Sequence, residues 1–354
     1  MKLVKIVFAL TAAAAAAGTW AEVPHTYRCE RLVSGLGASD INDRGTISGS
    51  VEVEGDGIHP AIWRGRNVEA LPHLAGFEGA DTRAFSINRK GDMAGVVSTG
   101  GGLWPVLWTE GVGRRLPLLP HAADDTGEAF SLNSRGHAVG YSINSLGVEH
   151  AALWKNGKVI DLGALKGPDG ARKIASRAHA INFSGMVVGR SETPERGYHA
   201  VQWSNGTAAS LVDLGATAFG IASEARAVNG NGVVIGASSV GDDGVMRRPI
   251  GWIGGAAFDL KPVQGVDTGV TDINDTGTVV GYIDEIERGA LVWPHYFDAP
   301  IDLNALLDGN GCRDADGNPA RLIIASAINS RGQILATGMF EFPKFESFRL
   351  TPLD

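Results

Sequence analysis

The sequence predicts an all-β protein, a seven-bladed β-propeller built from four-stranded blades. Three observations support this fold: one phrase occurs seven times, a short apolar segment ending in tryptophan follows most copies, and 49 of the 354 residues are glycine. Glycine at about twice its usual share, without long runs of helix formers, is typical of short strands joined by tight turns. We therefore expect strands throughout and take the repeat as the blade.

The repeated phrase has the pattern Ala-x-x-[Ile/Leu/Val]-Asn-x-x-Gly. Asparagine shortly before glycine, between two β-rich runs, indicates a hairpin, because Asn bonds the turn backbone and Gly accepts the left-handed conformation. A second glycine follows seven residues after each asparagine, except in the last copy, which has Ala336. The seven copies cover residues 38–45, 84–91, 129–136, 178–185, 225–232, 270–277 and 325–332, and the sixth begins with Val270.

Each copy provides four strand candidates, named A to D in chain order. Strand A ends at the asparagine, strand B contains the second glycine, strand C ends at the tryptophan, and strand D ends at Asp-Leu. Four strands in roughly 47 residues match a propeller blade and leave too little helix for a helical solenoid. The tryptophans are expected to pack between blades. They are Trp63, Trp108, Trp154, Trp203, Trp252 and Trp293, with Leu350 at the seventh place.

The two ends of the repeat array complement each other. The seventh copy provides strands A, B and C, the last at residues 346–350, whereas residues 27–32 form a strand candidate ahead of the first strand A. Pairing this N-terminal strand into the last blade would complete that blade and remove an open edge. We therefore predict a closed ring and regard an open β-solenoid as the weaker alternative.

Residues 1–21 are interpreted as a secretory signal peptide, because two lysines precede an apolar run at residues 6–17 and a small-residue cleavage site. That run is shorter than the about 20 residues that span a bilayer. We expect residues 22–354 to form a single exported domain, periplasmic or extracellular, without a membrane anchor. In an oxidising compartment Cys29 and Cys312 are expected to form a disulfide. Since Cys29 lies on the proposed closing strand, this bond would lock the ring.

Several phrases resemble the HAF repeats of bacterial extracellular repeat proteins. The third and fourth copies match best, with residues 150–154 and 199–203 reading His-Ala-x-x-Trp, followed by Asn-Gly and then by Asp-Leu-Gly. Residues 302–352 are similar to the usual ending of this family. The resemblance covers nearly the whole mature chain and implies an exported, propeller-like protein. It implies no catalytic residue, because the family is defined by its repeat rather than by an activity.

Function is expected on the loops. The B-to-C and D-to-A connections vary in length and content, and variable loops on a rigid scaffold commonly bind ligands. The formal net charge is −8 and the cations are scattered along the sequence, which argues against nucleic acid as a partner. Motifs of zinc hydrolases, nucleophile elbows and nucleotide-binding loops do not occur in the sequence, and we predict no catalytic residue.

We expect a non-catalytic binding or scaffold propeller whose ligand is a glycan, an envelope component or a protein. The alternative is a hydrolase or lyase that acts on an extracellular polymer through loop carboxylates, and a third possibility is a purely structural surface protein. The sequence indicates no oligomeric state. The candidate ligand-binding residues are Asp124, Asp125, Arg172, Arg196, Asp242, Asp243, Arg247, Asp284 and Glu285.

Two features are candidates for metal binding. His59, His150 and His199 occupy equivalent places in three blades, which fits either a ligand set around the ring or three strand-end histidines with local hydrogen bonds. The insertion at residues 308–318 is rich in oxygen ligands, although it lacks the glycine and the glutamate of an EF-hand. A looser calcium site there would use Asp314, Asp316 and Asn318, and no other cofactor is expected.

Overall fold

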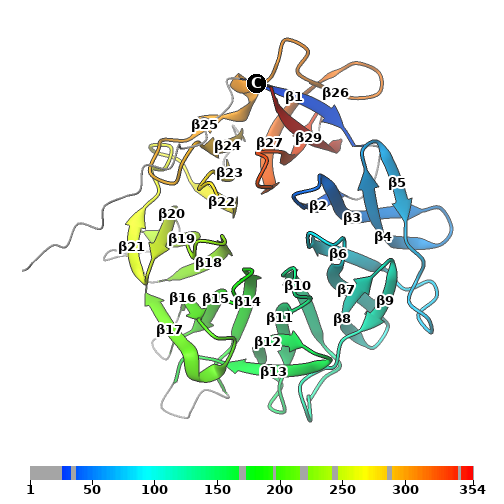
Figure 1. Cartoon of the computed structure of the whole chain (residues 1–354), viewed down its shortest axis with the longest axis vertical. Coiled ribbons are helices and arrows are strands. Elements are labelled where there is room, and N and C mark those ends of the chain that lie inside the picture. Colours follow the sequence, from blue (N-terminus) through cyan, green and yellow to red (C-terminus); the bar gives the residue numbers. More distant parts are fainter. Residues whose placement is uncertain are drawn as a thin grey trace, which may run out of the picture.

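The strands form seven antiparallel sheets, arranged as blades around a central channel (Figure 1). This computed structural model describes residues 26–32, 37–166, 173–193, 197–215, 222–240, 246–284, 289–341 and 344–353. The predicted seven-bladed propeller is confirmed. Among the described residues, no helix has the length and apolar character needed to cross a membrane. The proposed signal peptide lies outside the described residues.

Blades 1 to 6 each pair their four strands in chain order, with strand A innermost. Blades 1 and 2 consist of β2 (Gly37–Ile41), β3 (Thr46–Val53), β4 (Gly57–Arg64) and β5 (Asn67–Ala70), then β6 (Thr82–Ile87), β7 (Met93–Thr99), β8 (Gly102–Thr109) and β9 (Val112–Arg115). Blades 3 and 4 consist of β10 (Gly127–Leu132), β11 (Ala138–Ile143), β12 (Glu149–Lys155) and β13 (Lys158–Gly163), then β14 (Ser176–Ile181), β15 (Val187–Glu192), β16 (Tyr198–Trp203), the 3-10 helix η2 (Ala208–Ser210) and β17 (Leu211–Gly215). Blades 5 and 6 consist of β18 (Ser223–Val228), β19 (Val234–Val240), β20 (Met246–Ile253) and β21 (Ala256–Asp259), then β22 (Thr268–Ile273), β23 (Val279–Ile283), β24 (Gly289–Trp293) and β25 (Ile301–Asp302).

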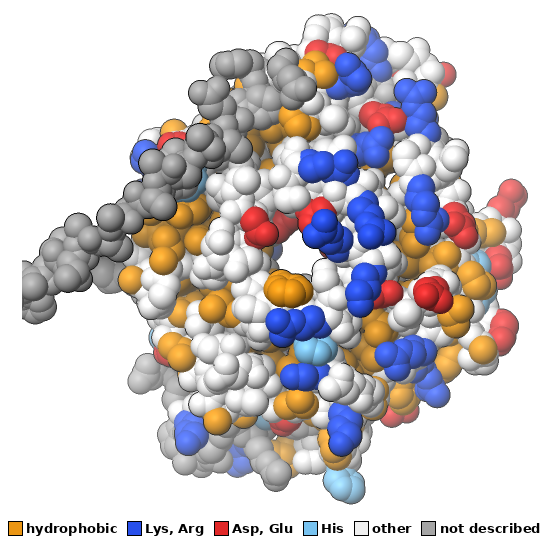
Figure 2. Space-filling view, viewed as in Figure 1, with side chains coloured by type: hydrophobic (Ala, Val, Ile, Leu, Met, Phe, Trp, Pro, Cys, Tyr) orange, Lys and Arg blue, Asp and Glu red, His pale blue; other side chains and the backbone are white. Residues whose placement is uncertain are grey.

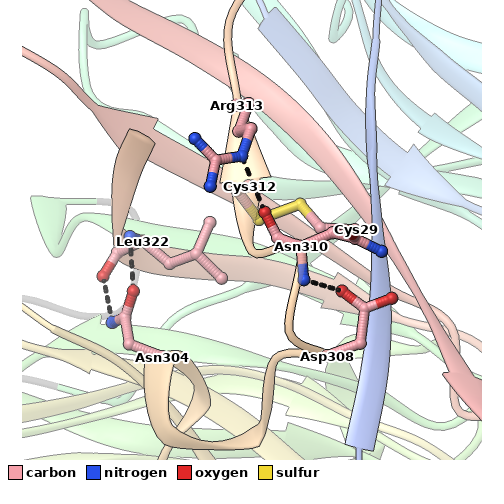
Figure 3. Close-up of a disulfide and its surroundings, with 7 residues drawn as sticks. All are labelled: Cys29, Asn304, Asp308, Asn310, Cys312, Arg313 and Leu322. Atoms are coloured by element: carbon pink, nitrogen blue, oxygen red, sulfur yellow. Dashed lines mark hydrogen bonds between the residues drawn. A yellow bond between two sulfur atoms is a disulfide. The ribbon is translucent and has the colours of Figure 1, made fainter. Parts of the chain in front are cut away.

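Blade 7 joins the two ends of the chain. After η3 (Leu303–Leu306), it contains β26 (Cys312–Arg313), β27 (Pro319–Ile328), β28 (Ile334–Met339) and β29 (Phe345–Leu353). Strand β1 (Thr26–Arg31) pairs antiparallel with β29, with Cys29 opposite Leu350, so the N-terminal strand closes the ring as predicted (Figure 1). The Cys29–Cys312 disulfide joins β1 to β26 across a Cα–Cα distance of 5.3 Å, which confirms the predicted pairing (Figure 3).

The hydrophobic core lies between neighbouring blades. All six repeat tryptophans are buried, and Trp203 of blade 4 packs in one cluster with Leu153 and Leu162 of blade 3. Its indole N–H donates to the Leu162 carbonyl at 2.8 Å. Trp154, Trp252 and Trp293 make the same kind of bond to the segment that ends strand D of the preceding blade. The predicted packing between blades is confirmed, and these bonds connect the tryptophan of one repeat with the end of strand D, or the residues just after it, in the repeat before it.

The second glycine of the repeat is required by a close backbone approach. A Cβ atom at Gly140 would lie 1.8 Å from the Glu128 carbonyl oxygen, and one at Gly95 would lie 1.9 Å from the Arg83 carbonyl oxygen. Blade 7 has Ala336 at this place, and its strand A carries an additional register shift between Leu322 and Ile324. This extra bulge lies close to Ala325, the residue that pairs with Ala336, so strand A of blade 7 follows a different path where the last copy departs from the pattern.

Candidate functional site

The seven repeat asparagines form a closed ring around one mouth of the channel. Each Nδ2 donates to the main-chain oxygen of the asparagine in the next blade, at 2.9 to 3.1 Å, and each Oδ1 accepts hydrogen bonds within its own turn. The predicted bond from Asn to its turn is confirmed. This asparagine ring consists of Asn42, Asn88, Asn133, Asn182, Asn229, Asn274 and Asn329, all of them buried. Both ends of each amide are satisfied, so the ring holds the blades together.

The channel mouth at the asparagine ring is a cavity of about 260 Å³. The turns that follow the ring in blades 7, 1, 2 and 3 carry exposed cations, namely Arg331, Arg44, Arg89, Lys90 and Arg135. Figure 2 shows Lys and Arg side chains gathered over these blades, with few on the opposite half. The fold thus brings together cations that the sequence scatters. The exclusion of nucleic acid relied on that scattering and stays a prediction.

Every strand A carries a β-bulge three residues before its ring asparagine. A bulge re-aims the side chain of the extra residue, and these residues lie on the innermost strand of each blade, beside the channel. The ring centroids of Phe85 and Phe130, the bulge residues of blades 2 and 3, lie 6.1 Å apart, and Phe130 lies 6.4 Å from His179 of blade 4. The bulge residues of blades 6, 7 and 1 are the smaller Thr271, Ser326 and Ser39. The channel wall is therefore bulky on one side and open on the other.

The open side forms a cavity of about 380 Å³ on the variable-loop face, between blades 7, 1 and 2. Gly37 and Ser39 of β2 leave the space that Arg83 and Phe85 occupy at the same positions of β6. Phe345 of β29, 42% exposed, lies on the wall that blade 7 provides. We call this space the blade 1 cavity. Its lining residues include Gly37, Ser39, Ser50, Arg83, Phe85, Thr337, Phe345 and Glu346.

The cation of the blade 1 cavity lacks a balancing acid. Glu346 is bound by the Arg31 guanidinium through two bonds of 2.5 and 2.9 Å, which neutralises its charge. Arg83 is exposed and forms no ion pair or side-chain hydrogen bond within the described part of the chain. The cavity therefore presents one free guanidinium beside two aromatic rings, a combination suited to a carboxylate next to an apolar group.

Blades 3 to 5 fill the other side of the same face with paired charges. Tyr141 donates to Glu128 at 2.9 Å, and Arg190 donates to Glu224 at 2.9 Å. Burial opposes ionisation of Glu224, but His179 and the neighbouring arginines outweigh it and hold the pKa of Glu224 below its usual range. Burial lowers the pKa of His179. These groups balance one another and leave less free charge than the blade 1 cavity.

Two carboxyl groups of the inner strands have raised pKa values. Burial and the nearby Asp40 charge raise the pKa of Asp272 to about 7, and burial also raises that of Asp40. Asp40 accepts from the Ile87 amide of blade 2 at 2.9 Å, and Asp272 accepts from the Ile328 amide of blade 7 at 2.9 Å. Both carboxyl groups join neighbouring blades. They lie on strands, whereas the hydrolase or lyase alternative relied on loop carboxylates.

Of the predicted ligand-binding residues, those that the structure describes lie in the connection to blade 3 and in blades 5 and 6. Asp124 accepts from the Thr126 hydroxyl at 3.1 Å in the connection to blade 3, beside Asp125, while Asp284 is exposed in blade 6. Arg247 of blade 5 lines a separate cavity of about 90 Å³ with Tyr198 and Glu224. The other predicted residues, Arg172, Arg196, Asp242, Asp243 and Glu285, lie outside the described residues.

The residues of the blade 1 cavity were not among the sequence predictions, because most of them lie on inner strands rather than on the variable loops. The sequence does contain a feature that indicates these residues. The residues on either side of the repeated alanine vary from blade to blade, from Gly37 and Ser39 in blade 1 to Arg83 and Phe85 in blade 2. Side chains that vary at a fixed position of a repeat are candidates for function, whereas those that recur serve packing.

The three equivalent histidines form local bonds, as the plainer interpretation predicted. His150 Nδ1 lies 2.9 Å from Asp161, and His199 Nδ1 lies 2.9 Å from Asp213, so each histidine of strand C pairs with an aspartate of strand D in its own blade. His59 instead contacts the Leu71 carbonyl oxygen at 2.9 Å. The three imidazoles therefore do not form one ligand set around the ring.

The predicted calcium loop has its own cation. Asp314 Oδ1 accepts from the amides of Asp316 and Asn318, and Oδ2 lies 2.7 Å from the Lys344 ammonium. The side chain of Asp314 is 1% exposed. This arrangement does not favour calcium at Asp314, Asp316 and Asn318, because Lys344 already balances the one buried carboxylate. Arg313 closes the loop from outside by donating to the Asn310 and Gly317 carbonyls (Figure 3 shows the bond to Asn310).

Comparisons with known proteins support the fold. No protein-family model matches this sequence, and no curated protein matches it. A solved structure of YCF48 bound to a D1 peptide is similar to this chain with a TM-score of 0.52 and 14% identity, over 93% of this chain and 97% of that one. The propeller domain of the Trilobed protease from Pyrococcus furiosus, described as having an open velcro topology, is similar with a TM-score of 0.54 and 10% identity, over 92% of this chain and 94% of that one.

A third similarity is to a structure of prolyl endopeptidases, with a TM-score of 0.59 and 13% identity. The matched region covers 93% of this chain but 48% of that one, so this chain spans about half the length of the endopeptidase. At these identities the similarities show the fold alone. This chain is a seven-bladed β-propeller, and its N-terminal strand closes the ring by pairing into the last blade. The Pyrococcus domain is described as open instead.

Proposed function

We propose that this protein is an exported, non-catalytic binding propeller of the HAF-repeat type, and that it binds an extended segment of a partner protein on its variable-loop face. The observation that carries this proposal is the blade 1 cavity, where the uncompensated Arg83 lies beside Phe85 and Phe345. A guanidinium next to two aromatic rings fits a peptide that offers an acidic or C-terminal carboxylate beside an apolar side chain.

The position of the cavity supports a peptide over a small molecule. Its walls come from blades 7, 1 and 2, and its volume of about 380 Å³ accommodates a few side chains. The similar YCF48 structure holds a D1 peptide, and that similarity extends over nearly the whole of both chains. The Cys29–Cys312 disulfide is consistent with the oxidising compartment that export implies.

The proposal is tested by selecting peptides from a random displayed library on the immobilised protein and measuring their affinities by calorimetry. Arginine and aromatic residues are the usual centres of binding energy, so we expect Arg83→Gln and Phe345→Ala each to weaken binding about tenfold or more. Arg114→Gln is the matched control, because Arg114 is an exposed arginine on the outer strand β9 of blade 2 and does not line the cavity. It should leave the affinity unchanged.

Two results would reject the proposal. One is a library that yields no specific peptide although the protein is folded and monodisperse. The other is a set of peptides that binds the parent and both cavity variants equally. A parallel screen of extracellular polysaccharides, with product analysis, distinguishes the alternatives: glycan binding at the same residues would replace the peptide as ligand, and cleavage would establish an enzyme.

A further inference from the structure

A second cluster of chemically active side chains lies on blade 1, away from the channel. Asp56 lies in the turn between β3 and β4, His59 lies on β4, and His73 lies in the connection from β5 to β6. One ligand atom from each residue lies within 4.8 Å of the other two. The sequence pattern associates His59 with the histidines of other blades, whereas the fold places it beside His73.

The hydrogen bonds of His59 fix its tautomer. Its Nδ1 lies 2.9 Å from the Leu71 carbonyl oxygen, which can only accept, so Nδ1 carries the hydrogen. A neutral His59 therefore directs the lone pair of Nε2 towards the Asp56 carboxylate, 3.1 Å away. Two acceptors at this distance need a positive charge between them, either a proton or a metal ion.

His73 approaches the same carboxylate from the other side. Its Nε2 lies 3.2 Å from Asp56 Oδ1 and 3.2 Å from the Asp56 main-chain oxygen. Both oxygens accept, so a neutral His73 without metal carries its hydrogen on Nε2 and must shift it to Nδ1 to bind an ion. Its ring centroid lies 3.9 Å from that of His59, so both imidazoles and the carboxylate of Asp56 converge on one point. One metal ion bound by both imidazoles would also balance the charge of the carboxylate.

We propose that Asp56, His59 and His73 bind one divalent transition-metal ion, with Zn²⁺ as the reference ion. Two imidazole nitrogens and one carboxylate oxygen are a zinc-type donor set, whereas calcium and magnesium prefer oxygen ligands alone. Metal–ligand bonds of about 2.0–2.2 Å place neighbouring donors of a tetrahedral site about 3.4 Å apart. The 3.1 and 3.2 Å separations between the Asp56 oxygens and the two imidazole nitrogens are close to this value.

The surroundings fit such a site. The Leu71 carbonyl holds the His59 ring in orientation, the outer-shell arrangement usual for a metal-binding histidine. The side chains of His59 and His73 are 7% and 9% exposed, whereas that of Asp56 is 53% exposed. The imidazoles are thus held in place while the carboxylate side faces solvent, which leaves room for water or a second ligand on the ion. The ion would fasten the connection between blades 1 and 2 to strand C of blade 1.

The test is a zinc titration of the chelator-treated protein, purified without an affinity tag, in competition with a chromophoric chelator. We expect one Zn²⁺ per chain. His73→Gln and Asp56→Asn should each lower the affinity at least about tenfold. His199→Gln is the matched control, because His199 occupies the repeat position of His59 and pairs with Asp213. We expect it to bind zinc like the parent.

A second measurement separates metal binding from folding. Zinc should raise the thermal unfolding midpoint of the parent and of His199→Gln, but not that of Asp56→Asn, whose midpoint without metal should equal the parent's. Cobalt substitution should give visible absorption bands that His73→Gln abolishes. The proposal is overturned if the parent binds no zinc up to about 1 mM, or if the ions that it binds are unaffected by His73→Gln and Asp56→Asn.

Discussion

The side-chain amide of Asn329 donates to the main-chain oxygen of Asn42 at 3.0 Å, although 287 residues separate them in the chain. This bond completes the asparagine ring between the last blade and the first. Farther out, β1 pairs with β29, and the Cys29–Cys312 disulfide holds β1 to the insertion that precedes β27. The propeller is therefore closed at the channel by side-chain amides and at its rim by a strand and a covalent bond.

Replacing one ring asparagine should destabilise the whole fold. Asn133→Ala removes the bond to the Asn182 carbonyl and the bonds to the amides of Arg135 and His137. Because these groups lie at buried or partly buried turns, we expect the free energy of unfolding to fall by about 2–4 kcal/mol. Urea denaturation measures it, with Ser134→Ala as the neighbouring control. A change below about 0.5 kcal/mol would show that the ring contributes little.

The disulfide should stabilise the closed ring. It connects residues that are 283 positions apart, for which chain entropy alone gives an upper bound of about 5 kcal/mol. We expect the Cys29→Ser and Cys312→Ser double variant to lose about 2–5 kcal/mol of unfolding free energy. A phosphine reductant should lower the melting temperature of the parent and leave that of the double variant unchanged. Equal sensitivity of the two proteins to the reductant would contradict this account.

The second glycine of the repeat should tolerate no side chain. In Gly140→Ala the new Cβ would lie 1.8 Å from the Glu128 carbonyl oxygen, so β10 and β11 would have to separate. We expect a loss of at least about 3 kcal/mol, or no folded protein. Gly100→Ala is the control, since no atom lies within 4 Å of its added Cβ and its φ is not positive. Equal stability of the two variants would disprove the close approach.

The contribution of Asp272 to stability should fall as the pH rises from about 4 to 7. The folded chain keeps the Asp272 proton up to about pH 7, whereas the unfolded chain releases it near the usual pKa of 3.8. The folded state therefore binds more protons in this window, and the free energy of unfolding declines with pH. Because the Asp272 side chain is only half-buried, we expect Asp272→Asn to remove only about 1–2 kcal/mol of this decline. Urea denaturation at pH 5 and pH 8 measures it, and identical declines in the two proteins would contradict the shift.

Periodicity in the sequence predicted much of the fold. The turns, the four strands per blade, the closing strand and the Cys29–Cys312 bond all follow from residues that recur or complement each other. Contacts between blades were predicted less completely. The tryptophans were expected to pack between blades, but the hydrogen bonds between blades were not predicted. The bonds from Asn133 to Asn182 and from Trp203 to Leu162 join groups in neighbouring copies. A repeat pattern contains no information on which groups of neighbouring copies touch.

The candidate sites were predicted poorly for a physical reason. Arg83 and Phe345 lie in blades 2 and 7, and they border one cavity only because β2 carries the small Gly37 and Ser39 between them. His73 lies in a connection without any motif, and its proximity to His59 depends on the path from β5 to β6. Such juxtapositions depend on the three-dimensional course of segments that do not repeat.

The central claim is that a partner segment binds in the blade 1 cavity, and site-specific photo-crosslinking tests it most directly. A benzophenone amino acid would replace Phe345 at the cavity or, as the control, Val112, which is 71% exposed near the turn between β8 and β9. We predict that a selected peptide crosslinks efficiently at position 345, only weakly at position 112, and that excess unlabelled peptide prevents the reaction. Equal crosslinking at both positions, or crosslinking at position 112 alone, would contradict the account.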